Sequence, residues 1–481
     1  MNNWVTEELK TADLGDKRLN KRLTFIVEGL ASKPDKTVPQ TFEEASQAQA
    51  VYEFWSNPHV KPSQIIAAHR DATLLRIKGH SIILVIQDTT DLEFASLATR
   101  RGLGEISKQG VEGIKVHNVL SVTTDGVPLG LIKQIAWVRK KTRKGKGYEE
   151  RKRKIEEKES YRWLESFRET QELVPPEMEV VTVCDREGDI FELLASPRRE
   201  GAHLLIRAAQ NRNVKTSTEQ GEIQKLFTLL KSQEVVGEIV LDLQKTPRRK
   251  ARKATIQVKY ATVTLQVPSN KPPLKHNEPV EVAAILAEEI NPPPKEQKVS
   301  WLLLTTLPLN NVSDAFTYLK WYSLRWLIER YHYVLKSGCK IEELQLETGE
   351  RLLRALACYS IVAWRLLWLT YTSRLDPHQP ATVALEEEEW QSLYVKIHNK
   401  LELPREIPTI YQCVRWIARL GGFLARKGDG EPGVMTLWRG WQRLMDYVAM
   451  WKFMVAMVNE LECDKDKDIE MKKENRNKIC D

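Results

Sequence analysis

The stretch 81–88, SIILVIQD, decides the fold, because it is an apolar, β-branched run that ends in a carboxylate. Two further β-rich runs follow at 116–124 (VHNVLSVTT) and 128–138 (PLGLIKQIAWV), and a helical stretch separates them from 179–185 (EVVTVCD), which also ends in aspartate. Strands followed by a helix and another strand are typical of an α/β core. We therefore predict an α/β core in the middle of the chain.

The residues before this core, 1–65, have a helical pattern. The first helix has an apolar stripe at helical spacing, made by Leu19, Leu23, Ile26 and Leu30. A second helix is expected over 41–55, ending before Asn57-Pro58. Beside the stripe, on another face of the first helix, lie four basic residues: Lys17, Arg18, Lys21 and Arg22. Such a face suits the backbone of DNA, and an ordinary solvated face is an equally open interpretation.

The residues after the core change pattern once. From about 221 to 307 the chain is β-like, with Pro and Gly in the turns, and after residue 311 it is helical. The segment from 463 is mostly charged, which predicts a disordered tail.

Composition limits the possible classes of protein. The 481 residues are 42% hydrophobic and suffice for about three domains. Six cysteines without C-x-x-C spacing argue against a disulfide scaffold or zinc cluster. The N-terminus lacks an apolar signal core, and the best apolar run is interrupted by Arg365, so we expect a cytosolic protein with no membrane partner. The net charge of +8 is concentrated in residues 139–158 and 245–253, which favours a polyanionic partner.

The most informative segment is 321–338, WYSLRWLIERYHYVLKSG. Its polar residues are 3, 4, 3 and 4 apart, which predicts one face of a single helix that ends at Gly338: Tyr322, Arg325, Glu329, His332 and Lys336. An adjacent apolar stripe is expected to face the core: Leu324, Ile328, Tyr331 and Leu335. A carboxylate flanked by cations suits phosphoryl transfer. A surface helix with an ordinary Arg325–Glu329 pair is the alternative.

Two strand-end aspartates join this helix as candidate metal ligands. Asp88, Asp185 and Glu329 supply the hard oxygen donors that Mg²⁺ or Mn²⁺ prefers. Two such ions about 3.5–4 Å apart activate a water or a 3′-hydroxyl and stabilise the leaving oxygen of an in-line displacement. Each aspartate is also an ordinary turn or cap residue, and nearby carboxylates compete for the role: Asp91, Glu93, Glu187 and Asp189.

Several motifs together resemble one family. The spacing Tyr322-x2-Arg325-x3-Glu329-x6-Lys336 matches the Tyr-Arg-Glu-Lys signature of the DDE transposases of insertion-sequence family 4. The segments IQDTT (86–90) and VCDREGDI (183–190) resemble that family's two aspartate motifs. Further resemblances follow in the expected order: LGDKRLNKRL and AVYEFWSNP to its end-binding domain, AEEINPPP and SWLLLTTLP to its insertion, and IARLGGF to its C-terminal region.

The resemblance implies an RNase H-like α/β catalytic core with a β-rich insertion. The implied domains are a helical transposon-end DNA-binding domain (1–65), the catalytic domain (66–375) with its insertion at about 212–300, and a helical dimerisation domain (376–462), before the tail (463–481). The gap of 144 residues from Asp185 to Glu329 leaves room for the insertion. The implied catalytic triad of Asp88, Asp185 and Glu329 holds two Mg²⁺ or Mn²⁺ ions.

The resemblance also implies partners and DNA contacts. Tyr322, Arg325 and Lys336 would contact DNA near the cut, with Arg207 facing the same DNA. Apart from the resemblance, the place of His332 on the glutamate face makes it a further candidate DNA contact, with a hydrogen-bonded neighbour as the alternative. Trp301 would stack on a base flipped from the transposon end. The implied partners are terminal inverted repeats, target DNA and a second subunit, with IARLGGF and the Trp438/Trp441 pair as interface or core. The implied site in the cell is the cytoplasm, associated with the nucleoid.

The implied activity is cut-and-paste transposition through nicking, a hairpin, hairpin opening and strand transfer. An RNase H-like nuclease without strand transfer is one alternative. A catalytically silent DNA-binding transposition inhibitor is another, and the intact acidic positions lower it.

Overall fold

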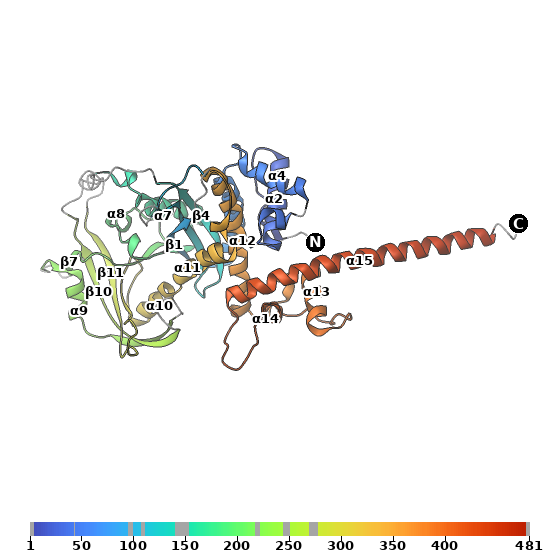
Figure 1. The fold of residues 1–481 in the computed structure, drawn as a ribbon. Coiled ribbons are helices and arrows are strands. Elements are labelled where there is room, and N and C mark those ends of the chain that lie inside the picture. The colour runs from blue at the N-terminus through green and yellow to red at the C-terminus, as the bar shows by residue number, and fades with distance from the viewer. Residues whose placement is uncertain are drawn as a thin grey trace. The chain divides into compact units, whose positions relative to one another are not determined.

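The computed structural model describes residues 4–42, 44–94, 100–106, 111–139, 153–216, 222–243, 251–268 and 278–477, with side chains as far as 458 (Figure 1). The described chain forms two compact units. One comprises residues 8–22 and 52–364, and the other comprises 1–7, 23–51 and 365–481. We describe each unit by itself.

A mixed sheet forms the frame of the first unit. Its strands are β1 (Ile82–Glu93), β2 (Gly104–Glu105), β3 (Glu112–Thr123), β4 (Pro128–Trp137), β5 (Glu179–Cys184), β6 (Ala202–Arg207), β7 (Asn213–Thr216), β8 (Gln224–Lys225), β9 (Gly237–Leu243), β10 (Arg252–Leu265), β11 (Val280–Glu289) and β12 (Ser300–Thr305). The order is β2-β3-β1-β5-β6-β12-β11-β10-β7-β8, with β4 on β3 and β9 on β10. β1, β5 and β6 run parallel and the other pairs antiparallel. The chain is thus mixed α/β, as predicted.

The β-rich segment expected at about 212–300 extends this same sheet. β6 pairs with β12 at Leu303↔Arg207, and β12 pairs in turn with β11. Figure 1 shows β10 and β11 at one end of the sheet and β1 and β4 toward the other. One hydrophobic cluster joins Trp163 and Phe167 of α7 (Tyr161–Leu173) to Leu204 of β6 and Leu286 of β11. The insertion strands and the central strands therefore share one core.

The remaining helices of the first unit surround the sheet or follow it. They are α5 (Pro62–Ile77), η1 (Ile155–Glu157), η2 (Arg186–Gly188), α8 (Phe191–Leu194), α9 (Leu226–Ser232), α10 (Val312–Ser323), α11 (Trp326–Tyr333), η3 (Val334–Gly338) and η4 (Ile341–Glu343). Three helices have several residues in each unit: α2 (Lys17–Ser32), α4 (Ala45–Ser56) and α12 (Gly349–Leu375). The second helix predicted at 41–55 is present as α4.

The single helix predicted for 321–338 is broken. α10 ends at Ser323, and Leu324 and Arg325 donate to carbonyls three residues back, which tightens the turn before α11 begins at Trp326. After Tyr333 the chain widens into a π-helical turn, η3, which ends at Gly338. The predicted apolar stripe still packs inward, since Ile328, Tyr331 and Leu335 are buried and Leu324 is half-buried. Spacing by itself gave no sign of either irregularity.

The second unit is helical in its described residues. It contains α1 (Trp4–Glu8) as far as Glu7, α3 (Val38–Thr41), η5 (Ala381–Val383), α13 (Glu387–His398), α14 (Ile410–Leu420) and α15 (Val434–Asn477). Two glycines bring α14 and α15 together: a Cβ on Gly440 would lie 1.7 Å from the Ile417 carbonyl oxygen, and one on Gly421 would lie 1.9 Å from the Thr436 carbonyl oxygen. The IARLGGF motif therefore serves close helix packing.

Two of the later helices, α15 and α12, bear on expectations from the sequence. α15 is helical through Asn477, in contrast to the disordered tail predicted from 463, and its many Lys and Glu residues are good helix formers. In the described part of the chain, α12 alone is long and apolar enough to cross a membrane, and 89% of its apolar window is buried, as in a core helix. The predicted basic blocks lie largely outside the described residues, in 140–152 and 244–250.

Candidate active site

The two predicted aspartates lie side by side at the edge where parallel pairing ends. β1 and β5 are in register up to Gln87↔Cys184, so Asp88 and Asp185 follow on neighbouring strands. Asp185 ends its strand as predicted and caps η2, where it accepts a hydrogen bond from the Glu187 N–H at 2.8 Å. Asp88 does not end its strand, because β1 continues to Glu93 in antiparallel pairing with β3. The parallel partner stops at this point, and the strand itself does not.

The electrostatic surroundings of Asp88 connect it with the other two acids. Its side chain is 16% exposed. The pKa of Asp88 is raised to about 7, mainly by burial and also by the negative charges of Asp185 and Glu329, against the opposing charge of Arg325. Its carboxylate accepts a hydrogen bond from the Thr89 N–H at 2.9 Å. The charges of Asp185 and Glu329 therefore act on Asp88 across one site.

Glu329 lies on α11 and is half exposed. Its Oε1 accepts a hydrogen bond from Arg325, which begins that helix. Burial disfavours the charge on Arg325, but Tyr322, Glu329 and Asp88 outweigh it and raise the arginine's pKa. The surface pair considered from the sequence is thus present, and the same arginine also interacts with Asp88.

His332 is buried beside Asp88. Its Nδ1 lies 3.9 Å from Asp88 Oδ2, and its Nε2 lies 3.0 Å from the Asn118 amide nitrogen. Because that amide donates, Nε2 accepts and Nδ1 carries the proton toward Asp88. Burial lowers the pKa of His332 to about 3, helped by Lys336 and Arg325, so the ring is neutral. Of the two roles considered, the hydrogen-bonded neighbour fits this geometry.

Tyr322, Trp301 and Arg207 come together from three elements. The ring centroids of Trp301 and Tyr322 are 5.2 Å apart in an edge-to-face arrangement of 69°. Arg207 donates to the Ser300 carbonyl at 3.0 Å, directly before Trp301. Tyr322 is 3% exposed, whereas Trp301 is half-buried and keeps part of its ring accessible. Trp301 is thus neither a fully buried core residue nor a free surface residue.

Lys336 is anchored by residues of β1 and η4. Its ammonium donates to the Asp91 carbonyl oxygen and lies 3.6 Å from a Glu342 carboxylate oxygen. Asp91, one of the competing carboxylates, is ion-paired with Lys115. Asp189, another competitor, accepts from the backbone N–H groups of Ala209 and Gln210 and pairs with Arg212. These partners show that both competitors carry structural interactions.

The donor set fits a divalent cation, although the side chains do not yet surround one. Among the residues that the structure describes, no three His, Cys, Asp or Glu side chains are close enough to hold a metal. Glu329 instead binds Arg325. The negative charges of Asp185 and Glu329 nevertheless contribute to the raised pKa of Asp88, and a bound cation would offset the repulsion between these carboxylates and Asp88. Carboxylate oxygens are also the ligands that Mg²⁺ and Mn²⁺ prefer.

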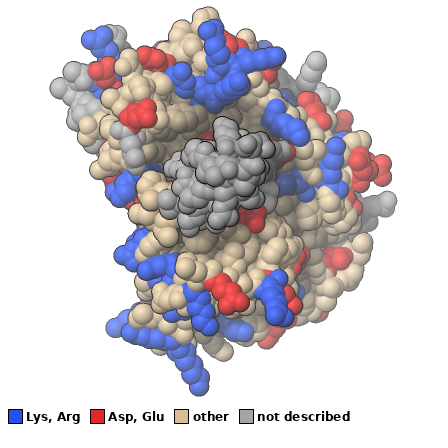
Figure 2. Space-filling model, turned by 90° about the vertical axis from the view of Figure 1, so that its right-hand side faces the viewer, with Lys and Arg blue, Asp and Glu red and all other residues tan. Residues whose placement is uncertain are grey.

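The predicted basic face of α2 has an exposed part. Lys17, Arg18 and Lys21 are exposed and Arg22 is half-buried. Arg18 bonds to the carboxylate of Asp16 before the helix, with its side chain 91% exposed. Figure 2 shows that Lys and Arg side chains spread over one face of the molecule with Asp and Glu among them. Charge alone does not mark a single DNA path on that face.

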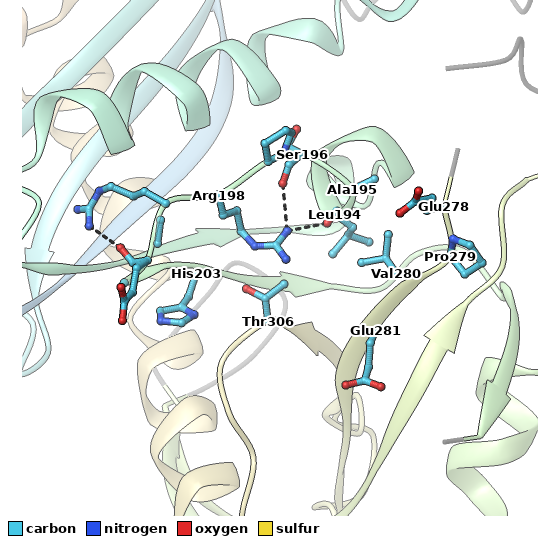
Figure 3. Close-up of a pocket in the computed structure, with 15 residues that line it drawn as sticks. Leu194, Ala195, Ser196, Arg198, His203, Glu278, Pro279, Val280, Glu281 and Thr306 are labelled. Atoms are coloured by element: carbon cyan, nitrogen blue, oxygen red, sulfur yellow. Dashed lines mark hydrogen bonds between the residues drawn. The ribbon is translucent and has the colours of Figure 1, made fainter. Parts of the chain in front are cut away.

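A hollow at the far end of β6 is a weaker candidate. Figure 3 shows Arg198, His203 and Thr306 along its wall, with Glu278 and Glu281 nearby. Arg198 donates to the carbonyls of Leu194 and Ser196, so it secures the end of α8. The hollow of about 690 Å³ mixes both signs of charge and does not gather acids.

Sequence reasoning missed several polar residues behind the acids. His117 and Asn118 are fully buried in β3, and Asn118 is paired in register with Asp88. Gln134 of β4 donates to Asn118 and to Ser360 of α12, both at 2.8 Å. Adjacent polar residues inside the apolar run VHNVLSV were the available signal.

Acids beside an arginine and a partly exposed tryptophan suit the binding of a cation and a polyanion at this edge of the sheet. Comparison with known families identifies the polyanion. Residues 71–364 match the family described as Transposase DDE domain, residues 1–60 match Transposase DNA-binding, and residues 361–459 match Transposase Tn5 dimerisation domain. The first match covers more than half of the chain, so the protein belongs to the DDE transposases. It is accordingly a DNA-cleaving enzyme with DNA-binding and dimerisation domains.

Proposed function

We propose that the protein is a cut-and-paste transposase of insertion-sequence family 4. It binds the terminal inverted repeats of its element, pairs two ends as a homodimer and joins them to target DNA. The observation that carries this proposal is the arrangement of Asp88 and Asp185 on neighbouring strands, in one electrostatic field with Glu329. The intact Tyr322-Arg325-Glu329-Lys336 spacing and the DDE family match support it.

Asp88, Asp185 and Glu329 would hold two Mg²⁺ or Mn²⁺ ions. Such ions supply activation of a nucleophilic oxygen and stabilisation of the leaving oxygen. Glu329 would give up its bond to Arg325 to take part, and its half-exposed side chain leaves it space to turn. The freed arginine would then be available for a phosphate oxygen.

The residues around the acids would position DNA. Tyr322, Arg325 and Lys336 would contact the backbone near the cut, and Arg207 would contact the same strand. The part-exposed ring of Trp301 would stack on a base flipped from the transposon end. The edge-to-face contact with Tyr322 would fix the orientation of the Trp301 ring. The basic face of α2, with Lys17, Lys21 and the residues around them, would bind the repeat.

The proposed chemistry consists of successive in-line displacements at phosphorus. Water attacks one strand at the element's end and releases a 3′-hydroxyl. That hydroxyl attacks the opposite strand, which forms a hairpin and frees the flanking DNA. A second water opens the hairpin, and the regenerated 3′-hydroxyl attacks target DNA. Each step forms one P–O bond and breaks one, so no external energy source is needed.

The proposed organisation follows the sequence. It comprises an end-binding domain at 1–65, an RNase H-like catalytic domain at 66–375 with its insertion at about 212–300, and a dimerisation domain at 376–462. Trp438 and Trp441 are buried, and Trp441 donates to the Ala31 carbonyl, so they do not form the dimer surface. Exposed Met450 and Phe453 on α15 support contact with a second subunit there. Because its substrate is chromosomal DNA, the protein would work in the cytoplasm, associated with the nucleoid.

The decisive experiment uses labelled DNA that carries the inverted repeats flanking the gene, with and without Mg²⁺. We expect the wild-type protein to form nicked, hairpin and strand-transfer products when Mg²⁺ is present and none of them when it is absent. A matched variant, Glu329→Gln, should form none of them. Hydrolysis without hairpins or joined products would favour an RNase H-like nuclease. Binding to the repeats without any cleavage in Mg²⁺ or Mn²⁺ would favour a silent transposition inhibitor.

A further inference from the structure

Arg162 bridges the two segments that carry the catalytic aspartates. It lies in the first turn of α7, and its side chain is 11% exposed. Its Nε donates to Thr89 Oγ1 at 3.0 Å, one residue after Asp88. One terminal nitrogen donates to Glu187 Oε2 at 3.0 Å, two residues after Asp185. A single guanidinium therefore spans the end of the β1–β5 parallel pairing.

The two residues that Arg162 holds are the same two whose backbone orients the acids. The Thr89 N–H donates to Asp88 Oδ1 at 2.9 Å, and the Glu187 N–H donates to Asp185 Oδ1 at 2.8 Å. A shift of either residue would move the amide and the carboxylate oxygen bound to it. The arginine's position therefore constrains both acids through one intermediate each.

The guanidinium is itself held tightly. Its other terminal nitrogen donates to the Glu159 carbonyl at 2.7 Å. Its centre lies 5.2 Å from the ring centroid of Trp137 and 5.7 Å from that of Trp163. Burial of such a group is costly unless its donors are satisfied. A planar fork with three directed acceptors meets that requirement, whereas a lysine ammonium would not reach all three.

Thr89 connects Arg162 to the buried polar residues of β3. Its hydroxyl lies 2.9 Å from His117 Nδ1, and His117 Nε2 lies 3.2 Å from Gln87 Oε1. Burial keeps the pKa of His117 well below its usual value, so the ring is neutral. Thr89 then accepts from Arg162 and donates to His117, which leaves its side chain a single orientation.

We propose that Arg162 is a positioning residue that holds Thr89 and Glu187, and through them the carboxylates of Asp88 and Asp185, at the spacing that a divalent cation needs. This role rests on the proposed metal-dependent cleavage. It differs from two simpler roles, a counter-charge to the acids and a structural contact of α7.

Metal binding separates these roles because they predict different directions of change. A counter-charge repels a metal cation, so Arg162→Gln would tighten Mn²⁺ binding and Arg162→Lys would leave it unchanged. A structural contact would lower thermal stability and leave Mn²⁺ affinity as it was. A positioning residue loosens Mn²⁺ binding in both variants, because neither side chain reproduces the fork.

The test measures free Mn²⁺ by electron paramagnetic resonance during titration of the full-length protein without DNA. We expect about tenfold weaker binding in both Arg162→Lys and Arg162→Gln, the usual size for loss of a group that orients a metal ligand. Arg168→Gln is the matched control, since Arg168 is exposed on the same helix. It should bind Mn²⁺ as the wild type does.

Each other outcome has a definite meaning. Unchanged or tighter Mn²⁺ binding in the Arg162 variants, with a normal wild type, overturns the positioning role alone. If the wild type and Asp88→Asn both fail to bind Mn²⁺, the proposed function fails and this role fails with it. If the Arg162 variants do not fold, Thr89→Val is the second variant, because it removes one acceptor of the Arg162 side chain. The positioning role requires that Thr89→Val weaken Mn²⁺ binding, and unchanged binding would exclude that role.

Discussion

Asp88 in the unit built on the sheet and Glu389 in the helical unit are two buried carboxylates with the same raised pKa and different surroundings. Burial is the first cause in both, and both pKa values rise to about 7. Glu389 accepts the backbone N–H of Glu386 at 2.8 Å and caps α13. Asp88 instead faces Asp185 and Glu329. A raised pKa thus marks burial, and the neighbouring groups distinguish the candidate catalytic acid from a helix cap.

A third buried acid shows the opposite shift. Glu8 is 5% exposed, and burial alone would raise its pKa, yet His69 and Arg76 together lower it to about 2. Arg76 binds both of its oxygens, at 2.7 and 2.9 Å. His69 contacts the same carboxylate. An arginine and a hydrogen-bonded histidine therefore accompany the structural acid, whereas two like charges oppose the effect of Arg325 at the candidate catalytic one.

The largest expected effect is the loss of DNA cleavage when Asp88 is substituted. Asp88→Asn should reduce DNA cleavage by about a thousandfold or more, because an amide cannot supply a charged metal ligand. The measurement is the single-turnover rate of nicking on inverted-repeat DNA. Glu389→Gln is the matched control and should cleave within about twofold of the wild type. Equal losses in both variants would mean that burial, and not the neighbouring acids, decides the role.

The next effect concerns stability at Glu8. Glu8→Gln should lower the free energy of unfolding by about 3 kcal/mol at pH 7, since it leaves the half-buried Arg76 without its carboxylate. The folded pKa lies below the ordinary value of 4.5, so the stabilisation is present above pH 4.5 and is lost as pH falls through about 2.

Urea unfolding at pH 7 and pH 3 measures this effect. The gap between wild type and Glu8→Gln should narrow at the lower pH, and the exposed neighbour substitution Glu7→Gln should produce no comparable gap. A gap that widens in acid would contradict the assignment of Glu8 as an ionised partner.

The smallest effect is a gain in stability when Glu389 is substituted, in contrast to the loss expected at Glu8. Because the folded pKa of Glu389 is raised, its contribution to stability is full below pH 4.5 and is lost as pH rises through about 7. Glu389→Gln keeps a capping oxygen without the charge, so it should stabilise the protein by about 1–2 kcal/mol at pH 8 and by little at pH 5. Thermal melting at both pH values checks this, with half-buried Glu388→Gln as control. A destabilised variant at pH 8 would show that the carboxylate is bound as an anion.

Local sequence pattern was enough to predict much of the frame. The apolar runs before Asp88 and Asp185 form the neighbouring parallel strands β1 and β5, and the buried stripe of 321–338 packs as expected. These features depend on residues close together in the chain. The continuation of β1 past Asp88 does not depend on neighbouring residues, since it requires pairing with residues of β3 that lie 20 to 28 positions further along the chain.

The site shows the same division. Asp185 was predictable because a strand and a cap meet there within a few residues. Arg162 was not predictable, because its two side-chain acceptors lie 73 and 25 residues away. The burial of His332 likewise depends on Asn118, 214 residues distant. Spacing assigned His332 to the polar face but did not distinguish a surface contact from a buried one.

The π-helical turn at Val334–Gly338 has a consequence for changes in chain length. It places Lys336 against Asp91 after a helix that is already interrupted before Trp326. Deleting one residue before Lys336 in the turn would favour ordinary α-helix and change the direction in which Lys336 leaves the helix. Lys336 would then face elsewhere, although every residue of the signature was still present. Single-residue deletions in this turn should therefore be tolerated less well than most substitutions there.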